Sequence, residues 1–198
     1  MLNPFTYIIS AIVSPSDGAH LRRKGSVMTV LENAIDVAKK EKISTIVIAS
    51  TTGGTALKLF ELAKGSKLKL IVVTHDEGRL PQERRFKEEI RRWLLVNCVT
   101  IYTHNIQGML LRRIVDAIFE RFGLPAWHRH LRNIKEKFGT GIKVCHIIAR
   151  MLIEGNILRD GRVVVIAGKG SGADSSAVFF IKPRNKWPIL EKVLEVAR

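Results

Sequence analysis

The sequence predicts an α/β protein, a three-layer α/β/α sandwich in which helices cover both faces of a mostly parallel sheet. Short runs rich in β-branched residues, typical of strands buried on both faces, alternate with longer segments of helical periodicity. The first three runs are separated by segments long enough for right-handed βαβ crossovers. Only residues 168–176, which include the glycine-rich loop at 168–174, separate the last two runs, so these two strands are expected to be antiparallel neighbours.

The predicted strands share a short apolar core that ends in polar residues or glycine. In chain order they are residues 45–49, 68–74, 98–102, 162–167 and 177–181. Residues 5–13 form a further apolar run, which we interpret as a buried strand because no basic segment of the kind found in signal peptides precedes it.

The predicted helices carry apolar residues at intervals of three and four. Ser26 is suited to cap the first helix, and Gly65 to end the second. Glu88 and Arg92 have the spacing of an ion pair on an exposed helix. The helices expected are residues 26–42, 56–64, part of 79–95, 106–122, 126–138, 142–154 and a last helix that starts at Pro188 and reaches the C-terminus.

Composition favours a globular chain with a strongly basic surface. The 198 residues are 46% hydrophobic, which suits a single domain over residues 1–198. Cys98 and Cys145 are interpreted as reduced core thiols of a cytoplasmic protein, and the spacing typical of a metal site is absent. No apolar run approaches the ~20 residues of a membrane span. The formal charge of +15 permits a polyanionic partner, but the dispersed Lys and Arg residues also suit an incidental basic surface.

Residues 50–55 (STTGGT) follow the first strand and lead into the second helix. A turn of this kind directs several free N–H groups to one point, where the helix dipole adds positive potential. Its glycines let the backbone approach a ligand closely, and its threonines can donate hydroxyl groups. The turn therefore suits a phosphate group. The alternative is a plain strand-to-helix turn with a threonine cap that binds nothing.

Three more loops are expected beyond the carboxyl ends of the strands, where ligands bind in open α/β sheets. They are residues 75–78, 103–105 and 168–174. In the last loop Lys169 and Ser171 suit a phosphate group. Asp174 would repel phosphate and is expected to fix the loop or to bind a ligand hydroxyl.

The glycine spacing at residues 168, 170 and 172 is similar to the dinucleotide-binding fingerprint. That fingerprint belongs to a strand-to-helix turn early in a βαβ unit, whereas this loop joins the two strands of a hairpin. We therefore reject a dinucleotide site here.

Histidines within helices are interpreted as structural. His128 and His130 lie on a basic helix and are expected at the surface. His146 lies within an apolar helix and is expected to be a core histidine rather than a ligand.

Taken together, these segments resemble the C-terminal α/β domain of pyruvate kinases over nearly the whole chain after residue 25. The resemblance lies in VLENAIDVAKKEKISTIVIASTTGGTALKL, LKLIVVTHDEG and ILRDGRVVVIAGKGSGADSSAVFFIKP. It implies a five-stranded sheet in the order 3-2-1-4-5, with strand five antiparallel. It also implies that residues 50–55 and 168–174 match the loops of the sugar-bisphosphate effector site. Because no catalytic barrel precedes this domain, we expect no pyruvate kinase activity.

The chain resembles even more closely a stand-alone archaeal family of this fold. Members of that family carry the motifs VVTH…G, FGxGxKVC and GxGxGAD, which match residues 72–78, 138–145 and 168–174. This resemblance implies that flavin mononucleotide (FMN) can be held at this edge of the sheet. The chain departs from the family pattern at His146, where the family usually carries Glu, and at Lys169 and Ser171.

The main hypothesis is a binding site for a phosphorylated small molecule, with FMN as the suspected cofactor. The residues expected to form it are Ser50, Thr51, Thr52, Gly53, Gly54, Thr55, Thr74, His75, Thr103, His104, Lys143, Gly168, Lys169, Gly170, Ser171, Gly172, Ala173 and Asp174. If flavin is bound, the cofactor would supply hydride transfer, with His75 or His104 as proton donor. No activated catalytic constellation is visible, so binding is favoured over catalysis.

Two alternatives come from other classes of function. Residues 79–92 and 127–137 would supply the phosphate contacts of a protein that binds RNA or DNA. A regulatory or assembly module that forms homo-oligomers is the third hypothesis.

Overall fold

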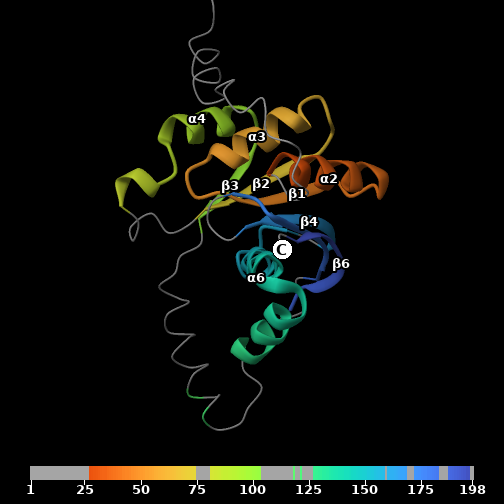
Figure 1. The fold of residues 1–198 in the computed structure, drawn as a ribbon. Helices are drawn as coiled ribbons and strands as arrows, with labels where there is room; N and C mark the ends of the chain where they lie inside the picture. Colours follow the sequence, from red (N-terminus) through yellow and green to blue (C-terminus); the bar gives the residue numbers. More distant parts are fainter. Residues whose placement is uncertain are drawn as a thin grey trace, which may run out of the picture.

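The computed structural model describes residues 27–74, 81–103, 118, 121, 127–158, 160–168, 172–182 and 187–196. Within these residues, helices lie on both sides of a central mixed sheet (Figure 1), so the chain has the predicted α/β fold. The predicted strand at residues 5–13 and most of the predicted helix at residues 106–122 lie outside the described part. None of the described helices is long and apolar enough to cross a membrane.

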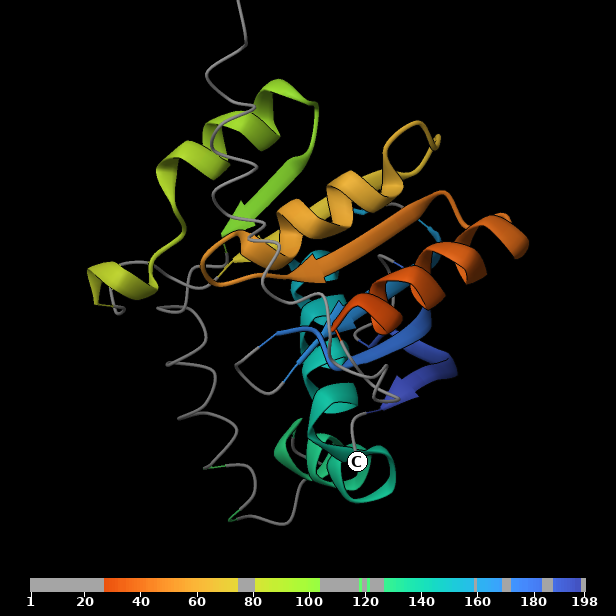
Figure 2. The same ribbon diagram turned by 45° about the horizontal axis from the view of Figure 1, so that its top comes forward.

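The sheet contains six strands in the order β3-β2-β1-β4-β5-β6. The strands are β1 (Thr45–Ala49), β2 (Lys69–Thr74), β3 (Thr100–Thr103), β4 (Gly161–Ala167), β5 (Ser175–Ile181) and β6 (Ile189–Val196). The first four are parallel, and in Figure 2 the arrows of β1 and β3 point to the same edge of the sheet. β5 is antiparallel to both β4 and β6. The order of the first five strands agrees with the prediction, and a sixth strand extends the sheet.

Two apolar cores separate the three layers. The helices are α2 (Val27–Lys40), α3 (Gly54–Ala63), the short 3-10 helix η3 (Gln82–Arg84), α4 (Glu88–Val96) and α6 (Trp127–Glu154). One core packs α2, α3 and α4 against alternate strand residues such as Ile46 and Ile48, and the other packs α6 against residues such as Val47. Because successive strand residues point to opposite faces, a strand covered on both sides must be apolar throughout.

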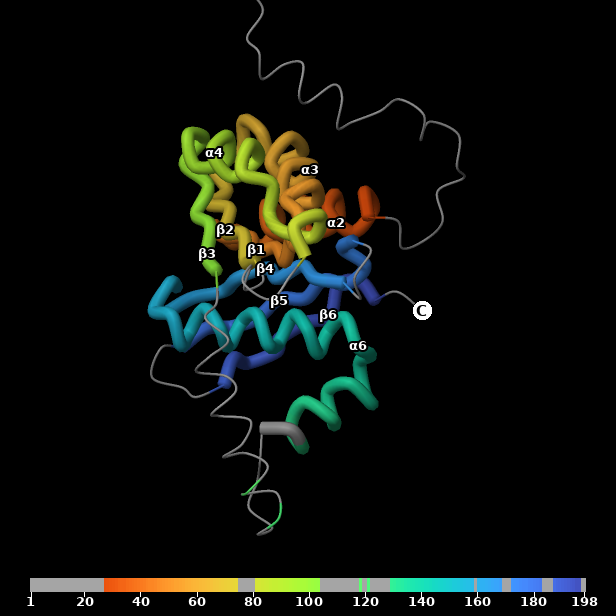
Figure 3. The backbone as a smooth tube through the Cα atoms, turned by 90° about the vertical axis from the view of Figure 1, so that its left-hand side faces the viewer, coloured from red at the N-terminus to blue at the C-terminus, as the bar shows by residue number. Residues whose placement is uncertain are grey.

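Figure 3 shows that helix α6 changes direction, and the residue with non-helical backbone angles inside it is Gly139. The glycine has φ 86° and ψ 172°, a conformation outside the helical region that favours glycine. Its Cβ-free backbone also lies near β6, because a Cβ there would be 3.5 Å from Val196 Cγ1. The two helices predicted on either side of residues 139–141 are therefore the two halves of α6, joined by a sharp bend.

The prediction of a helix after Pro188 is wrong, because these residues form β6 at the edge of the sheet. Leu190, Val193 and Val196 all pack into the core beneath α6, and their three-residue spacing resembles helical periodicity. The register between β5 and β6 shifts at two places. At each of them β6 contains one more residue than the facing part of β5. Each bulge returns the next apolar residue to the same face of the strand.

Cys98 was expected in the core and is instead exposed, whereas Cys145 is buried as predicted. The predicted strand at residues 98–102 begins later, at Thr100. Cys98 lies in the turn after α4 with φ 59°, a left-handed conformation. Its side chain therefore precedes the pleated part of β3.

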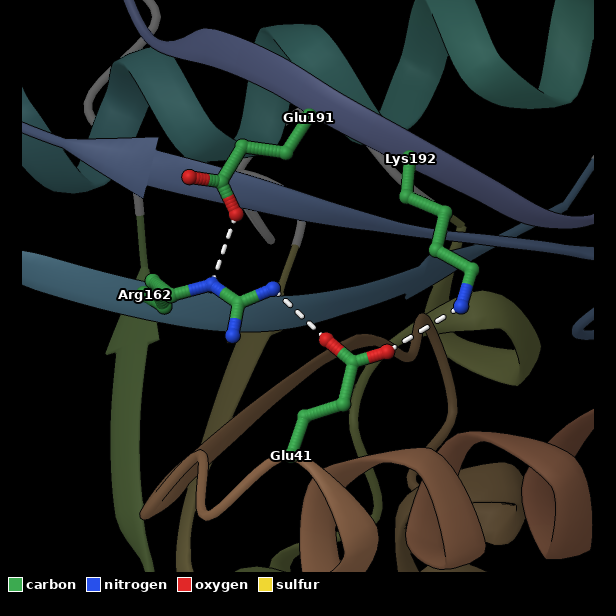
Figure 4. A network of polar contacts seen from close by, with 4 residues as sticks. All are labelled: Glu41, Arg162, Glu191 and Lys192. Atoms are coloured by element: carbon green, nitrogen blue, oxygen red, sulfur yellow. Dashed lines mark hydrogen bonds and ion pairs between the residues drawn. The ribbon is translucent and has the colours of Figure 1, made fainter.

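Four charged side chains connect β4 and β6 to the segment after α2 (Figure 4). Arg162 Nη2 donates to Glu41 Oε2 at 2.6 Å, and Arg162 Nε donates to Glu191 Oε2 at 2.7 Å. Lys192 Nζ completes the network by donating to Glu41 Oε1 at 3.0 Å. The hydrogen bonds from Lys192 and Arg162 lower the pKa of Glu41. The network holds the edge strand β6 to the centre of the fold.

We expect Arg162→Met to lower the thermal midpoint and to reduce its dependence on salt. The substitution keeps the apolar stem and removes both ion pairs of the guanidinium, and exposed ion pairs weaken as salt screens them. Differential scanning calorimetry at low and high NaCl measures both quantities. Arg92→Met is the matched control, because Arg92 is 77% exposed and pairs with Glu88 within one helix. Equal effects of the two substitutions would contradict a structural role for the network.

Candidate functional site

The strands β1 and β4 are direct neighbours, and their carboxyl ends lie at the same edge of the sheet. They are parallel, with Ile46 opposite Val164 and Ile48 opposite Ile166. Residues 50–55 follow β1, and Gly168 begins the connection from β4 to its antiparallel neighbour β5, so the two connections leave adjacent strands at one edge. This adjacency is the structural condition on which the predicted site depends.

The loop after β1 is held by backbone and hydroxyl contacts. The Ser50 N–H donates to the carbonyl of Val73 at 3.1 Å, which ties the loop to β2. Ser50 is 6% exposed, and its Oγ accepts a hydrogen bond from the Gly53 N–H at 3.2 Å. The hydroxyl of Ser50 therefore shapes the turn from inside, whereas Thr51, Thr52 and Thr55 are only half-buried.

Gly53 is the N-cap of α3 and has φ 95°. A Cβ at this position would lie 2.9 Å from Ile90 Cγ2 and 3.0 Å from the ring of Phe86, so α4 and the segment before it cover one side of the turn. No side chain of the described residues caps α3 at Gly53. The first N–H groups of the helix have no acceptor within the helix itself, which leaves donors at the start of α3.

The hairpin after β4 closes tightly. The Asp174 N–H donates to the carbonyl of Ala167 at 3.0 Å, and a side chain at Gly168 would overlap the carbonyl of Gly172. Gly172 has φ 145°, and a Cβ there would lie 2.8 Å from Val27 Cγ2 at the start of α2. Ala173 is 2% exposed and belongs to the core on the α2 side, so it supports the hairpin from below.

The carboxylate of Asp174 is engaged within the hairpin. Its Oδ1 accepts a hydrogen bond from Ser175 Oγ at 2.8 Å. The second half of α6 packs against the same point, because a Cβ on Gly141 would overlap the Ser175 side chain. Lys143, which is half-buried, follows Gly141 in this part of the helix. The start of the second half of α6 therefore lies beside the start of β5.

Two threonines join the ends of β2 and β3. Thr74 Oγ1 lies 2.9 Å from Thr103 Oγ1 in a hydrogen bond, with Thr74 buried and Thr103 exposed. Both belong to the same edge of the sheet as the loop after β1. The other predicted site residues, namely His75, His104, Lys169, Gly170 and Ser171, lie outside the described part.

A histidine pair on α6 was not predicted. His130 Nε2 and His146 Nε2 lie 3.0 Å apart in a hydrogen bond. His146 is 2% exposed, as expected of a core histidine, but His130 is half-buried rather than on the surface. The two residues are far apart on a straight helix, and only the bend at Gly139 brings them together. No motif in the sequence marks this contact.

Comparison with known proteins gives only a distant likeness of fold. No protein-family model matches the chain. The structure is similar to that of Cryptosporidium parvum pyruvate kinase solved in complex with ADP, with a TM-score of 0.37 and 13% sequence identity. The alignment covers 90% of this chain and 27% of that one. A likeness of this degree is a weak, pyruvate kinase-like similarity of fold and carries no function.

We expect Gly53→Ala to lower the free energy of unfolding by about 1–3 kcal/mol. The added Cβ would face both a left-handed φ and close contact with Ile90 and Phe86. Gly54→Ala is the matched control, because a Cβ on Gly54 meets no atom within 4 Å and alanine favours the first turn of a helix. Urea unfolding of both variants measures the difference. Equal stability of the two variants would show that the turn is not fixed by Gly53.

Proposed function

We propose that the protein binds a phosphorylated small molecule at the carboxyl edge of its parallel strands, with FMN as the suspected ligand, and that it lacks pyruvate kinase activity. The observation that carries the proposal is the pairing of β1 with β4, which makes the uncapped start of α3 and the glycine hairpin neighbours. The three half-buried threonines of residues 50–55 supply hydroxyl donors at the same place.

Each group has a separate part in the proposed site. The N–H groups at the start of α3 bind the phosphate, because a helix N-terminus combines free donors with positive potential. Thr51, Thr52 and Thr55 add hydroxyl groups, and Lys143 adds a cation from α6. The glycine hairpin lies along the ligand, where the lack of side chains allows close approach.

Two of the predicted site residues take a supporting part in this proposal. Ser50 shapes the turn, because its hydroxyl already accepts the Gly53 N–H. Asp174 fixes the hairpin, because its carboxylate accepts from Ser175 and would repel a phosphate. A bound flavin would supply hydride transfer, and His75 and His104 stay predicted proton donors for that chemistry.

A phosphate requirement is testable with FMN and riboflavin, which differ only by the phosphate group. Quenching of flavin fluorescence by the full chain is expected to show binding of FMN, and binding of riboflavin weaker by about tenfold or more. Thr55→Glu is expected to weaken FMN binding by a similar factor, because a carboxylate in the first turn of α3 repels phosphate and competes for its donors. The same carboxylate favours the helix dipole, so the fold is retained.

Lys67→Gln is the matched control for Thr55→Glu. It also changes the net charge by one unit in the negative direction, but Lys67 is exposed just before β2, at the opposite edge of the sheet. FMN affinity is expected to stay within about twofold of the original chain. Equal affinity for FMN and riboflavin, or equal effects of the two substitutions, would refute the phosphate site.

The exposed face of α6 favours nucleic acid as the second candidate partner. Arg129, Arg132 and Lys135 are all exposed and recur every three residues on one side of the helix. Such a row suits contacts with a phosphate backbone. Fluorescence anisotropy with a labelled single-stranded and a double-stranded oligonucleotide would show affinity that falls steeply with salt. Affinity that stays flat between low and physiological salt would exclude this role.

A further inference from the structure

The two halves of α6 are joined across the Gly139 bend by a contact between buried and half-buried imidazoles. His130 lies in the first half and His146 in the second, with their Nε2 atoms 3.0 Å apart. The first half, residues 127–138, also buries Leu131 and Ile134, and Ile134 belongs to the core beneath the sheet. Figure 3 shows the first half beneath the second, with the bend between them.

An aromatic ring packs against each histidine of the pair. The His146 ring packs edge-on against Phe179 of β5, with ring centroids 5.6 Å apart. The His130 ring lies 4.8 Å from the ring of Trp187, just before β6. Neither neighbour ionises near neutral pH. The pair therefore lies in surroundings that disfavour charge.

The charged groups that face the pair, within the described residues, come from α6 itself. The Arg150 guanidinium lies 4.4 Å above the Trp187 ring, and Arg150 Nε donates to Glu154 Oε1 at 2.6 Å. Burial lowers the pKa of His130, and Arg150 lowers it further. Burial lowers the pKa of His146 to about 3, with additional contributions from His130 and Arg150. Both imidazoles are therefore neutral at pH 7, so that one Nε2 donates and the other accepts.

We propose that the His130–His146 hydrogen bond is an acid-sensitive latch, which holds residues 127–138 against the second half of α6 across the Gly139 bend. If both rings are protonated, both Nε2 atoms become donors and neither can accept. Two positive charges would then lie side by side next to Arg150. The closed latch is thus stable with neutral imidazoles, and protonation of the rings favours the open state.

Opening begins well above the pH at which the closed pair would titrate. Once residues 127–138 are released, both histidines reach solvent and regain a pKa near 6.5. The open state then binds more protons than the closed state, so stability of the closed state falls as pH falls below about 6.5. His146 alone raises the opening equilibrium by up to about tenfold for each pH unit below that value. Opening would also disturb the start of the second half of α6 beside Asp174. An effect of this disturbance on ligand binding rests on the function proposed above.

Amide hydrogen exchange followed by mass spectrometry tests the latch on the full chain without any ligand, so its outcome is separate from that of the phosphate site. After correction for the intrinsic exchange rate, the amide protection factors of residues 127–138 are expected to fall by about 100-fold between pH 7.5 and 4.5. Protection of α2, which contains no histidine, is expected to change much less. Equal loss of protection in both segments, or none in residues 127–138, would overturn the proposal.

The variant His146→Gln retains a neutral side chain that can hydrogen-bond to His130 and removes the ring that titrates. Its protection in residues 127–138 is expected to change by less than about tenfold over the same pH range. Unchanged pH dependence in this variant would overturn the proposal. If the variant fails to fold, ¹⁵N NMR of the histidine rings in the original chain decides the question. A His146 ring that is still neutral at pH 5 supports the latch, and a ring that titrates near pH 6.5 overturns it.

Discussion

The parallel pairing of β1 with β4 at the centre of the sheet is the constraint on which the rest of the structure depends. Both strands are covered by helices on both sides, so water cannot reach their backbone N–H and C=O groups. These groups must therefore form hydrogen bonds with neighbouring strands, because unpaired buried groups would destabilise the fold. The pairing joins segments that are far apart in the sequence. It fixes which loops meet at the carboxyl edge, because each parallel strand ends there. The site proposed at that edge follows from the sheet topology rather than from any one motif.

The two edges of the sheet differ in how their polar groups are satisfied. At the amino edge, Arg162 and Lys192 are matched by Glu41 and Glu191 in one network. At the carboxyl edge, polar groups of the described loops hold the loops' own shape. The Ser50 hydroxyl accepts from the Gly53 N–H, and the Asp174 carboxylate accepts from Ser175. The donors at the start of α3 are not capped by a described side chain. This difference is the reason why the proposed phosphate site is placed at the carboxyl edge rather than at the amino edge.

Sequence patterns predicted the elements whose periodicity is undisturbed. The strands β1, β2, β4 and β5 contain continuous apolar runs, and the bend in α6 is marked by the glycines at residues 139 and 141. The shorter β3 has an apolar centre between two threonines. Strand β6 escaped prediction because its two bulges give apolar residues a three-residue spacing, which is the signal of a helix. The β1–β4 adjacency was implied by resemblance alone, since strand order is a long-range property. The partner of Ser50 within its own turn and the contact of His130 with His146 depend on three-dimensional geometry that no local pattern encodes.

The bend at Gly139 combines two sources of stability that respond differently to pH. Leu131 and Ile134 are both less than 10% exposed, and a straight α6 would carry them away from the contacts that bury them. Burial of each such side chain contributes about 1.5–3 kcal/mol, which favours the bent helix at any pH. A hydrogen bond between neutral imidazoles contributes less, about 0.5–1.5 kcal/mol. Apolar burial therefore accounts for most of the stability of the bend, and the histidine pair determines how that stability varies with proton concentration.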